Sequence, residues 1–401
     1  MARNAALTPA VALVMCVPGN TGIMVSTAQG GANSADLVIV GAGLAGSAAA
    51  WSASARGLAV VVLEQFGPGH RQGSSHGSAR IFRRAYPDPL YVRMTGRAGE
   101  LWRRLEDEAG ERLLRLTGGV DFGPLRDPGQ LHAILTSCGV PAELLDPQDA
   151  AQRWPGISFD GTGPVMFHAE AGVIDPEHAM GAMLRLAVGQ GADVRFNTPV
   201  THVAATPGGG ATVHTDSGTF TAPVVAVAVG GWLAPLLGNL VRLPELTVTQ
   251  QQAFHFAPRA AAAWPIFVCQ DEADNFYGLP GGRDGGVPGA IKLGEHCNGT
   301  VTTASGRDGI VDPAARKRAV AFAEHRLPGL NSDPAGDLTC LYTTTASEDF
   351  ILDRQGPFVI SSACSGHGAK FAPLLGEIIA GLAIGEPAPD SRFTLAAHLC
   401  Q

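Results

Sequence analysis

The stretch DLVIVGAGLAGSAAAWSASARGLAVVVLE, residues 36–64, decides the fold of this chain. An apolar run, an Ala-rich run and a second apolar run follow one another in it, with a GxGxxG turn after the first run. The apolar runs predict buried strands, and the Ala-rich run predicts a helix. The order of strand, glycine turn, helix and strand is typical of the βαβ unit in a Rossmann-like dinucleotide-binding domain.

Each glycine of this turn has a separate physical task. Gly41 permits the tight turn, Gly43 lets the backbone approach a pyrophosphate, and Gly46 lets the helix pack closely on the strand. The free N–H groups and the positive dipole end of the helix attract phosphate. Glu64 closes the second strand, where its carboxylate can accept hydrogen bonds from ribose hydroxyls. Because a carboxylate there disfavours a 2′-phosphate, the unit predicts NAD or FAD rather than NADP.

Composition and charge narrow the class of protein. The 401 residues suffice for two modest domains or one large domain. A formal net charge of −8 argues against a broad nucleic-acid surface, and the sequence has no uninterrupted apolar run long enough for a membrane-spanning helix. The seven cysteines are widely spaced and form no CxxC pair, so we expect neither a metal site nor a disulfide framework.

The N-terminal residues 1–33 differ from the rest of the chain. Arg3 precedes an apolar stretch over 5–17, and the small residues at 26–28 loosely imitate the end of a secretory signal. We expect a leader that is disordered or processed, or a true start at Met24. The protein is expected to be cytoplasmic, with export as the alternative.

The order of predicted elements indicates an α/β protein whose dinucleotide domain is interrupted. Parallel-sheet signals occur near the start, middle and end of the chain, whereas runs typical of an antiparallel sheet lie between them. Helices are predicted over 91–116, 180–188, 312–326 and 373–384, and antiparallel strands within 246–295. We assign 34–116, 185–240 and 340–401 to the dinucleotide-binding domain, and 117–184 and 241–339 to an inserted α+β substrate domain.

Several separated segments resemble one enzyme family when taken in order. They are 41–46 with Glu64, 74–86, 153–156, 230–232, 291–296, 339–343 and 365–371. Over roughly residues 35–395 the chain is similar to monomeric sarcosine oxidase, N-methyltryptophan oxidase and pipecolate oxidase, which are FAD-dependent amine oxidases of the D-amino-acid-oxidase type. The resemblance implies FAD as cofactor and a monomer that acts on a small amino acid with O₂.

The resemblance also implies the reaction. A secondary-amine or cyclic amino acid loses a hydride to flavin N5 and becomes an imine, and O₂ reoxidises the flavin and yields hydrogen peroxide. The amine must be neutral to release hydride. Burial and nearby cations lower the pKa of an amine, so no side-chain base is required.

The same resemblance implies which residues hold and tune the flavin. Cys340 matches the cysteine that attaches FAD through the 8α-methyl carbon, Arg80 matches an arginine close to the ring, and Lys292 matches the lysine that activates O₂ near N5. Other matched cofactor contacts are Ser74, Ser75, His76, Ile81, Gly366, His367, Gly368 and Lys370. The alternatives are a buried structural thiol at Cys340 and a solvent-facing charge at Lys292.

The implied substrate site combines cations with neutral polar groups. Arg83 and Lys370 match the pair that grips the substrate carboxylate, since a guanidinium binds a carboxylate bidentately and an ammonium adds a point charge. His296, Tyr342 and Tyr277 match side chains around the amine. Among all these residues, Lys292, His296, Arg80 and Tyr342 are the candidate catalytic set.

Some positions depart from the family pattern. Glu295 and Ala369 stand where aromatic residues are usual, and Gly281 and Gly282 stand where bulkier residues are expected, which predicts a roomier pocket. Glu295 either selects a second polar group of the substrate or faces water. Three other functions stay open: a flavin dehydrogenase with another electron acceptor, an NAD-dependent dehydrogenase, and a flavin-binding scaffold without activity.

Overall fold

A parallel sheet forms the half of the molecule that begins with the glycine turn. The structure is a computed structural model, and it describes residues 33–400. The sheet order is β20-β21-β13-β1-β2-β9, and all neighbours are parallel except β20 and β21. The strands are β1 (Leu37–Val40), β2 (Val60–Leu63), β9 (Asp193–Arg195), β13 (Val224–Val227), β20 (Ile351–Gln355) and β21 (Phe358–Ser362).

Layers on both faces of this sheet explain why its central strands are wholly apolar. One face packs against α1 (Leu44–Ala55), α5 (Pro176–Gly189) and α8 (Ala372–Ala383). The other face packs against a small sheet and two short helices: β10 (Val200–Ala205), β11 (Ala211–Thr215), β12 (Gly218–Ala222), α6 (Leu233–Leu237) and α9 (Leu395–Leu399). Strands β1, β2 and β13 are buried at every position, as parallel strands covered on both faces should be.

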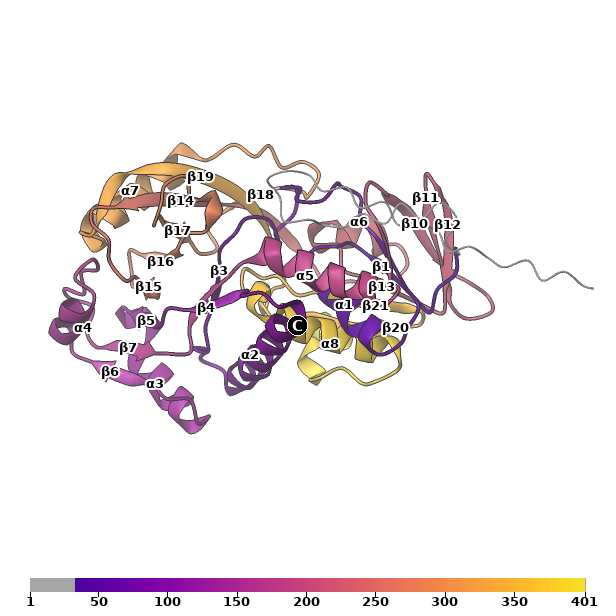
Figure 1. Cartoon of the computed structure of the whole chain (residues 1–401), viewed down its shortest axis with the longest axis horizontal. Coiled ribbons are helices and arrows are strands. Elements are labelled where there is room, and N and C mark those ends of the chain that lie inside the picture. Colours follow the sequence, from indigo (N-terminus) through magenta and orange to yellow (C-terminus); the bar gives the residue numbers. More distant parts are fainter. Residues whose placement is uncertain (1–32, 401) are drawn as a thin grey trace, which may run out of the picture.

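The second large sheet is mainly antiparallel and lies at the other end of the long axis (Figure 1). Its order is β18-β14-β17-β16-β15-β5-β7-β6, and β19 pairs with the far side of β14. The strands are β5 (Gly119–Phe122), β6 (Glu143–Leu145), β7 (Val165–His168), β14 (Thr247–Pro258), β15 (Ile266–Gln270), β16 (Asn275–Pro280), β17 (Ile291–Glu295), β18 (Thr300–Val301) and β19 (Leu330–Thr344). The predicted α/β class with an antiparallel second sheet is confirmed.

Alternation along β17 orients a functional side chain. Ile291 and Leu293 enter the apolar core that α7 (Pro313–Arg326) covers. Lys292 lies between them and points to the opposite face, because successive side chains of a strand alternate. One face of the antiparallel sheet is therefore apolar and covered by α7, and the other face carries Lys292 and is directed toward the parallel sheet.

A third sheet and a long helix connect the two halves. The sheet order is β3-β8-β4, with β3 (Arg80–Phe82), β4 (Leu114–Leu116) and β8 (Gly172–Ile174). Helix α2 (Pro89–Ala109) starts with Asp88 capping the Leu90 amide. The prediction of a helix as far as residue 116 was wrong, because Gly110 adopts a φ of 68° and closes the helix. Helices α3 (Pro128–Ser137) and α4 (Pro147–Arg153) were not predicted.

The two large sheets draw their strands from segments that alternate along the chain. The division into a dinucleotide-binding domain and an inserted domain stays a prediction, and its boundary at 184/185 falls inside α5, whose buried residues join the core of the parallel sheet. The expected leader lies outside the described residues except for Asn33, whose carbonyl accepts a hydrogen bond from the Thr221 amide. Within residues 33–400, no helix is long and apolar enough to cross a membrane.

The contact beneath Gly46 gives a test of the fold. A Cβ on Gly46 would lie 1.8 Å from the Gly41 carbonyl oxygen, so Gly46→Ala must displace α1 from β1. We expect it to lower the free energy of unfolding by about 1–3 kcal/mol or more. Urea unfolding followed by circular dichroism measures this. Gly189→Ala at the end of α5 is the control, because its Cβ would meet no atom within 4 Å. Equal midpoints for the two variants would contradict the expected clash.

Candidate active site

One cavity of about 1180 Å³ contains almost all the predicted functional residues. Its lining includes Gly41, Gly43, Glu64, Ser74, Ser75, His76, Arg80, Ile81, Arg83, Tyr277, Lys292, His296, Cys340, Tyr342, Gly366, His367, Gly368 and Lys370. Gly46 is the exception, since it lies under the turn against the Gly41 carbonyl. Residues from both large sheets meet at this site with residues of the segment 74–86 around β3, which we call the β3 segment. The site is large enough for a cofactor and a substrate together.

The N-terminus of α1 is built to receive an anion. Gly43 is the N-cap residue and has no side chain to form a cap of its own, and the first turn carries no acidic residue. The Ser75 hydroxyl accepts from the Leu44 amide at 3.1 Å, and a Cβ on Gly43 would lie 3.2 Å from that hydroxyl. The buried Glu64 carboxylate accepts from the amides of Ala42 at 2.8 Å and Phe66 at 3.0 Å. The turn thus leaves a positive, closely fitted cradle that suits the pyrophosphate of FAD.

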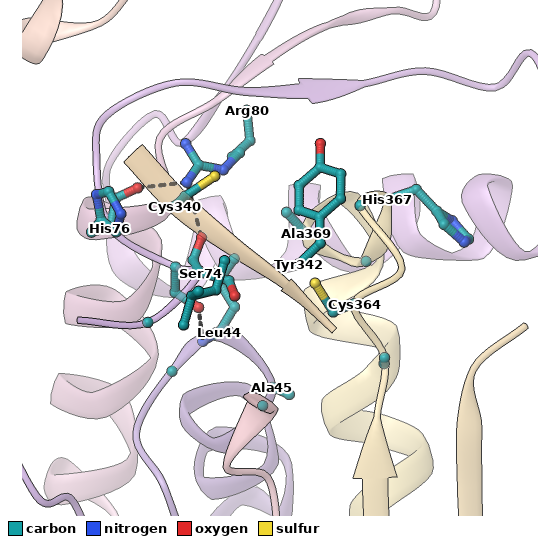
Figure 2. A pocket seen from close by; sticks show the side chains of 18 of the residues that line it. Leu44, Ala45, Ser74, His76, Arg80, Cys340, Tyr342, Cys364, His367 and Ala369 are labelled. Atoms are coloured by element: carbon teal, nitrogen blue, oxygen red, sulfur yellow. Dashed lines mark hydrogen bonds between the residues drawn. The ribbon is translucent and has the colours of Figure 1, made fainter. Parts of the chain in front are cut away.

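Arg80 organises the segment that follows the second strand. Its guanidinium donates to the carbonyls of Ser74 at 2.9 Å, His76 at 2.8 Å and Ala79 at 2.9 Å. Burial and the charges of Arg80 and Lys292 lower the pKa of His76 to about 3, so its imidazole is neutral. In Figure 2 the Arg80 guanidinium and the Cys340 thiol point toward the same part of the cavity.

Cys340 lies on β19 with its side chain in the cavity. It is 9% exposed, and β19 also carries Tyr342 two residues later on the same face of the strand (Figure 2). A second thiol, Cys364, lines the same cavity. Burial raises the pKa of Cys364, which keeps it a neutral thiol. Cys297 lines the cavity as well, so the cavity offers three cysteines in different surroundings, and Cys364 is a natural control for any role of Cys340.

Lys292 is a buried cation. It is 3% exposed, and its ammonium donates to the Ala79 carbonyl at 3.4 Å. Burial, followed by the charge of Arg80, lowers the pKa of Lys292 to about 7, while Asp284 opposes that shift. The alternative of a solvent-facing lysine on this strand does not fit such burial.

Asp284 belongs to a glycine-rich loop that closes on the β3 segment. Although burial opposes it, hydrogen bonds from Ser78 and the charge of Lys292 lower the pKa of Asp284 to about 2. The Ser78 amide donates to Asp284 at 3.1 Å, and the Ser78 hydroxyl donates to it as well. Asp284 is thus a permanent negative charge that favours the protonated form of Lys292.

Two further cations mark the other end of the cavity. The Arg83 guanidinium lies 4.6 Å from the centre of the Tyr86 ring, and the Lys370 ammonium lies 5.5 Å from the same centre. Lys370 donates to the His367 carbonyl at 2.6 Å. Burial, followed by the charge of Arg83, lowers the pKa of Lys370 well below its usual value. An anion bound between the two side chains would relieve this repulsion.

The remaining polar side chains near these cations are neutral at physiological pH. Burial, then the charges of Arg83 and Lys370, lower the pKa of His296 to about 4. Tyr277 and Tyr342 hydrogen-bond each other, and burial raises the pKa of Tyr277 to about 12. These groups can donate or accept hydrogen bonds, but they do not carry charge.

His367 is fixed in a network rather than presented to a ligand. Its Nδ1 hydrogen-bonds the Tyr86 hydroxyl at 3.1 Å, its Nε2 hydrogen-bonds the Glu348 carbonyl at 3.1 Å, and its ring stacks on Phe350 at 4.7 Å. Burial and the charge of Lys370 lower its pKa to about 3. The network positions the turn that carries Lys370.

The departures from the family pattern have structural reasons. Glu295 pairs with Arg318 at 2.9 Å and is absent from the cavity lining, so it does not select substrate. Gly282 permits close packing, because a Cβ there would lie 2.0 Å from the Ser78 hydroxyl, and it does not widen the cavity. Ala369 does line the cavity. Arg84, which had no predicted role, pairs with Glu170 at 2.7 Å.

Sequence reasoning missed two charged residues of the site. Asp284 lies in a loop with no motif, so nothing in the sequence pointed to it. Arg126 lines the cavity and pairs with Asp121 at 2.6 Å. A carboxylate inside the apolar run of β5 was the available signal, because an isolated aspartate on a buried strand needs a partner.

Comparisons with known proteins agree with this geometry. A family model described as FAD dependent oxidoreductase (DAO) matches residues 36–382. Monomeric sarcosine oxidase of Streptomyces avermitilis is 35% identical over 368 residues, which covers 87% of this chain and 93% of that protein. N-methyl-L-tryptophan oxidase of Yersinia pestis is 31% identical over 382 residues, which covers 90% and 98%. The open form of NikD, an amino acid oxidase essential for nikkomycin biosynthesis, superposes with a TM-score of 0.79 at 26% identity, over 90% of this chain and 97% of that chain.

The Glu64 carboxylate offers a test of the cofactor end. Glu64→Ala removes the acceptor of two backbone amides, those of Ala42 and Phe66, which costs about 1–3 kcal/mol for each buried donor left unpaired. We expect a lower unfolding temperature and, measured in a Cys340→Ser background so that no covalent bond retains the flavin, less FAD per protein molecule after gel filtration. Glu64→Gln keeps one acceptor oxygen, so its FAD content should fall between those of Glu64→Ala and the Cys340→Ser parent. An FAD content of Glu64→Ala equal to that of the parent, measured by absorbance at the flavin and protein bands, would contradict this role.

Proposed function

This chain belongs to the DAO family of FAD-dependent oxidoreductases, and we propose that it oxidises a secondary-amine or cyclic amino acid, sarcosine-like, N-methyl amino acid-like or pipecolate-like. In this proposal Cys340 holds FAD covalently, and O₂ takes the electrons and becomes hydrogen peroxide. The chain is a flavin-dependent amine or amino-acid oxidase by family. The substrate class, the thioether bond and the acceptor are the proposed parts.

The observation that carries the proposal is the pair of cations at Arg83 and Lys370, of which Lys370 is buried and Arg83 is half-buried. A substrate carboxylate placed between them gains two charge-assisted contacts in a water-poor cavity. Both side chains are held by backbone carbonyls, so they are positioned before the substrate arrives. Such anchoring fixes the amine carbon relative to the rest of the cavity and supplies much of the rate.

The same cations prepare the amine. Bound FAD would supply the acceptor for the hydride that leaves the amine carbon. Arg83, Lys370 and burial lower the pKa of a bound amine, which favours the neutral form with a free lone pair. His296, Tyr277 and Tyr342 are neutral and can orient that lone pair without taking a proton. The amine loses two electrons and two protons overall and becomes an imine, and O₂ takes up both electrons and both protons.

Lys292 supports the oxygen half of the reaction in this proposal. A fixed positive charge in a dry site lowers the cost of forming superoxide, the first product of electron transfer to O₂. Lys292 is buried, and Asp284 favours its charged form. A dehydrogenase that uses another acceptor would not need such a charge.

The attachment site is tested by acid precipitation. We expect the flavin absorbance of the wild-type protein to stay with the pellet, and Cys340→Ser to release it to the supernatant. Cys364→Ser is the matched control, because Cys364 lines the same cavity and should leave attachment unchanged. Flavin that stays with the pellet in Cys340→Ser would overturn the role of Cys340. A colourless protein that does not take up added FAD would overturn the proposed function as a whole.

The role of Lys292 is tested by stopped-flow kinetics. Lys292→Met should slow reoxidation by O₂ about 100-fold or more and largely spare reduction by substrate. The lysine is charged below its pKa of about 7, so the wild-type reoxidation rate should fall as pH rises through this value. The variant should lose that pH dependence. Asp284→Asn should move the fall to lower pH.

Lys317→Met is the control for that experiment, since Lys317 is an exposed lysine of α7. Oxygen kinetics in Lys292→Met equal to those of the control would refute the role. Absence of hydrogen peroxide during turnover would favour the dehydrogenase alternative instead.

A further inference from the structure

Strand β5 carries a fully buried carboxylate in an apolar run. Asp121 is 0% exposed and lies between the core residues Val120 and Phe122. Its Oδ1 accepts a hydrogen bond from Arg126 Nε at 2.6 Å. Within residues 33–400, its Oδ2 and both ring nitrogens of the neighbouring buried His168 have no hydrogen-bond partner. A buried carboxylate is tolerated only with a charged partner, so the position of Arg126 is firmly determined.

Arg126 reaches from this pair to the substrate end of the cavity. Its Nη2 donates to the Ala85 carbonyl at 3.2 Å, and the Arg83 guanidinium donates to the same carbonyl. Two guanidinium groups therefore lie side by side. Arg126 lines the cavity, and in the described part of the chain its Nη1 has no protein partner. That nitrogen is available to a ligand.

Three cationic side chains converge at this end of the cavity. Arg83, Lys370 and Arg126 all act on His296, which places three cations around one point of the cavity. Asp121 pairs with Arg126, and a substrate carboxylate would lie between Arg83 and Lys370. Of the carboxylates at the mouth, Asp88 pairs with the cation Arg392, whereas Asp349 and Glu348 hydrogen-bond the neutral Tyr91 hydroxyl and Cys297 thiol, which do not neutralise them. Within residues 33–400, the donor that a monocarboxylate substrate would leave without an acceptor is thus Arg126 Nη1, on a side chain that is 10% exposed.

We infer that Arg126 determines specificity and that the substrate is a secondary-amine amino acid with a second carboxylate. The first carboxylate lies between Arg83 and Lys370, and the second lies against Arg126 Nη1. The inference rests on the proposed function, because it takes the Arg83 and Lys370 pair as the anchor of the amino-acid carboxylate. The second carboxylate belongs to the side chain or to the nitrogen substituent, and it takes no part in the redox step.

The test compares substrates that differ by one carboxylate. N-methyl-L-aspartate is matched with N-methyl-L-alanine, and N-(carboxymethyl)glycine with sarcosine. For at least one pair, the wild-type holoenzyme should show a kcat/KM about 10- to 100-fold higher for the dicarboxylate, as expected for one hydrogen bond between charged groups. Hydrogen peroxide formation measures turnover, and titration of the flavin spectrum under anaerobic conditions measures binding.

The variant that tests Arg126 must not leave Asp121 buried without a partner. The double variant Arg126→Gln with Asp121→Asn replaces the ion pair by a neutral amide pair. It should lower kcat/KM for the preferred dicarboxylate by the same 10- to 100-fold factor and change that of its monocarboxylate partner less than about threefold. The matched control is Arg316→Gln with Asp333→Asn, a surface ion pair at 2.9 Å outside the cavity, which should change neither constant.

Each outcome decides between the possibilities. A wild-type enzyme that oxidises the monocarboxylates and shows no preference for either dicarboxylate overturns the inference and leaves the proposed function intact. A preference that survives in the folded double variant also overturns it and reduces Arg126 to a partner of Asp121. No oxidation of any of the four amines overturns the proposed function together with the inference. If the double variant does not fold, Arg126→Lys replaces it, because it keeps a positive charge beside Asp121 but lacks the second guanidinium nitrogen, and a preference that survives there overturns the inference.

Discussion

Positive charge buried in a single cavity is the constraint on which the rest of this structure depends. Arg80, Arg83, Arg126, Lys292 and Lys370 all line that cavity. Charged groups are costly to bury, and the usual remedy is a carboxylate beside each one. Asp121 pairs with Arg126, and Asp284 and Glu177 favour the protonated form of Lys292, whereas within residues 33–400 Arg80, Arg83 and Lys370 have no salt bridge to a carboxylate. The remaining charge is left for anionic ligands.

Hydrogen bonds to backbone carbonyls hold these cationic side chains in position. Arg80 is fixed by three carbonyls, Arg83 and Arg126 share that of Ala85, and Lys292 and Lys370 each contact one. A carbonyl orients an N–H group without cancelling its charge. The backbone carbonyls of the β3 segment and of the turn before α8 therefore solvate the cationic groups in place of water. The positive charge of these groups stays available to the pyrophosphate, the flavin and the substrate. This arrangement explains why segments far apart in sequence must converge on one site.

The parts of this site that the sequence could predict are those set by local rules or by resemblance. The βαβ unit follows from apolar runs and from glycines such as Gly41 and Gly46, whose positions leave no room for a Cβ. The candidate cofactor and substrate residues came from the resemblance to FAD-dependent amine oxidases, and almost all of them line one cavity in the structure. Arg126 and Asp284 could not be predicted, because their importance depends on contacts with Asp121 and Ser78 that only the folded chain creates. Glu295 was expected to contact either the substrate or water, but it pairs with Arg318. Arg318 lies on α7, which covers the face of the sheet opposite the cavity, so the folded chain removes a candidate that the sequence offered.

The two buried lysines differ in a way that assigns them to different ligands. Burial and Arg80 lower the pKa of Lys292, and Asp284 opposes that shift, so the pKa stays at about 7 and the protonated form has a partner in the protein itself. Lys370 faces Arg83 instead, and both burial and that neighbour lower its pKa. An anion placed between Arg83 and Lys370 raises the pKa of Lys370, because an opposite charge favours the protonated form. Occupancy of the carboxylate site and protonation of Lys370 are consequently linked, and each stabilises the other. The protonated form of Lys292 is therefore favoured by a carboxylate of the protein itself, whereas that of Lys370 is favoured by the carboxylate that it binds.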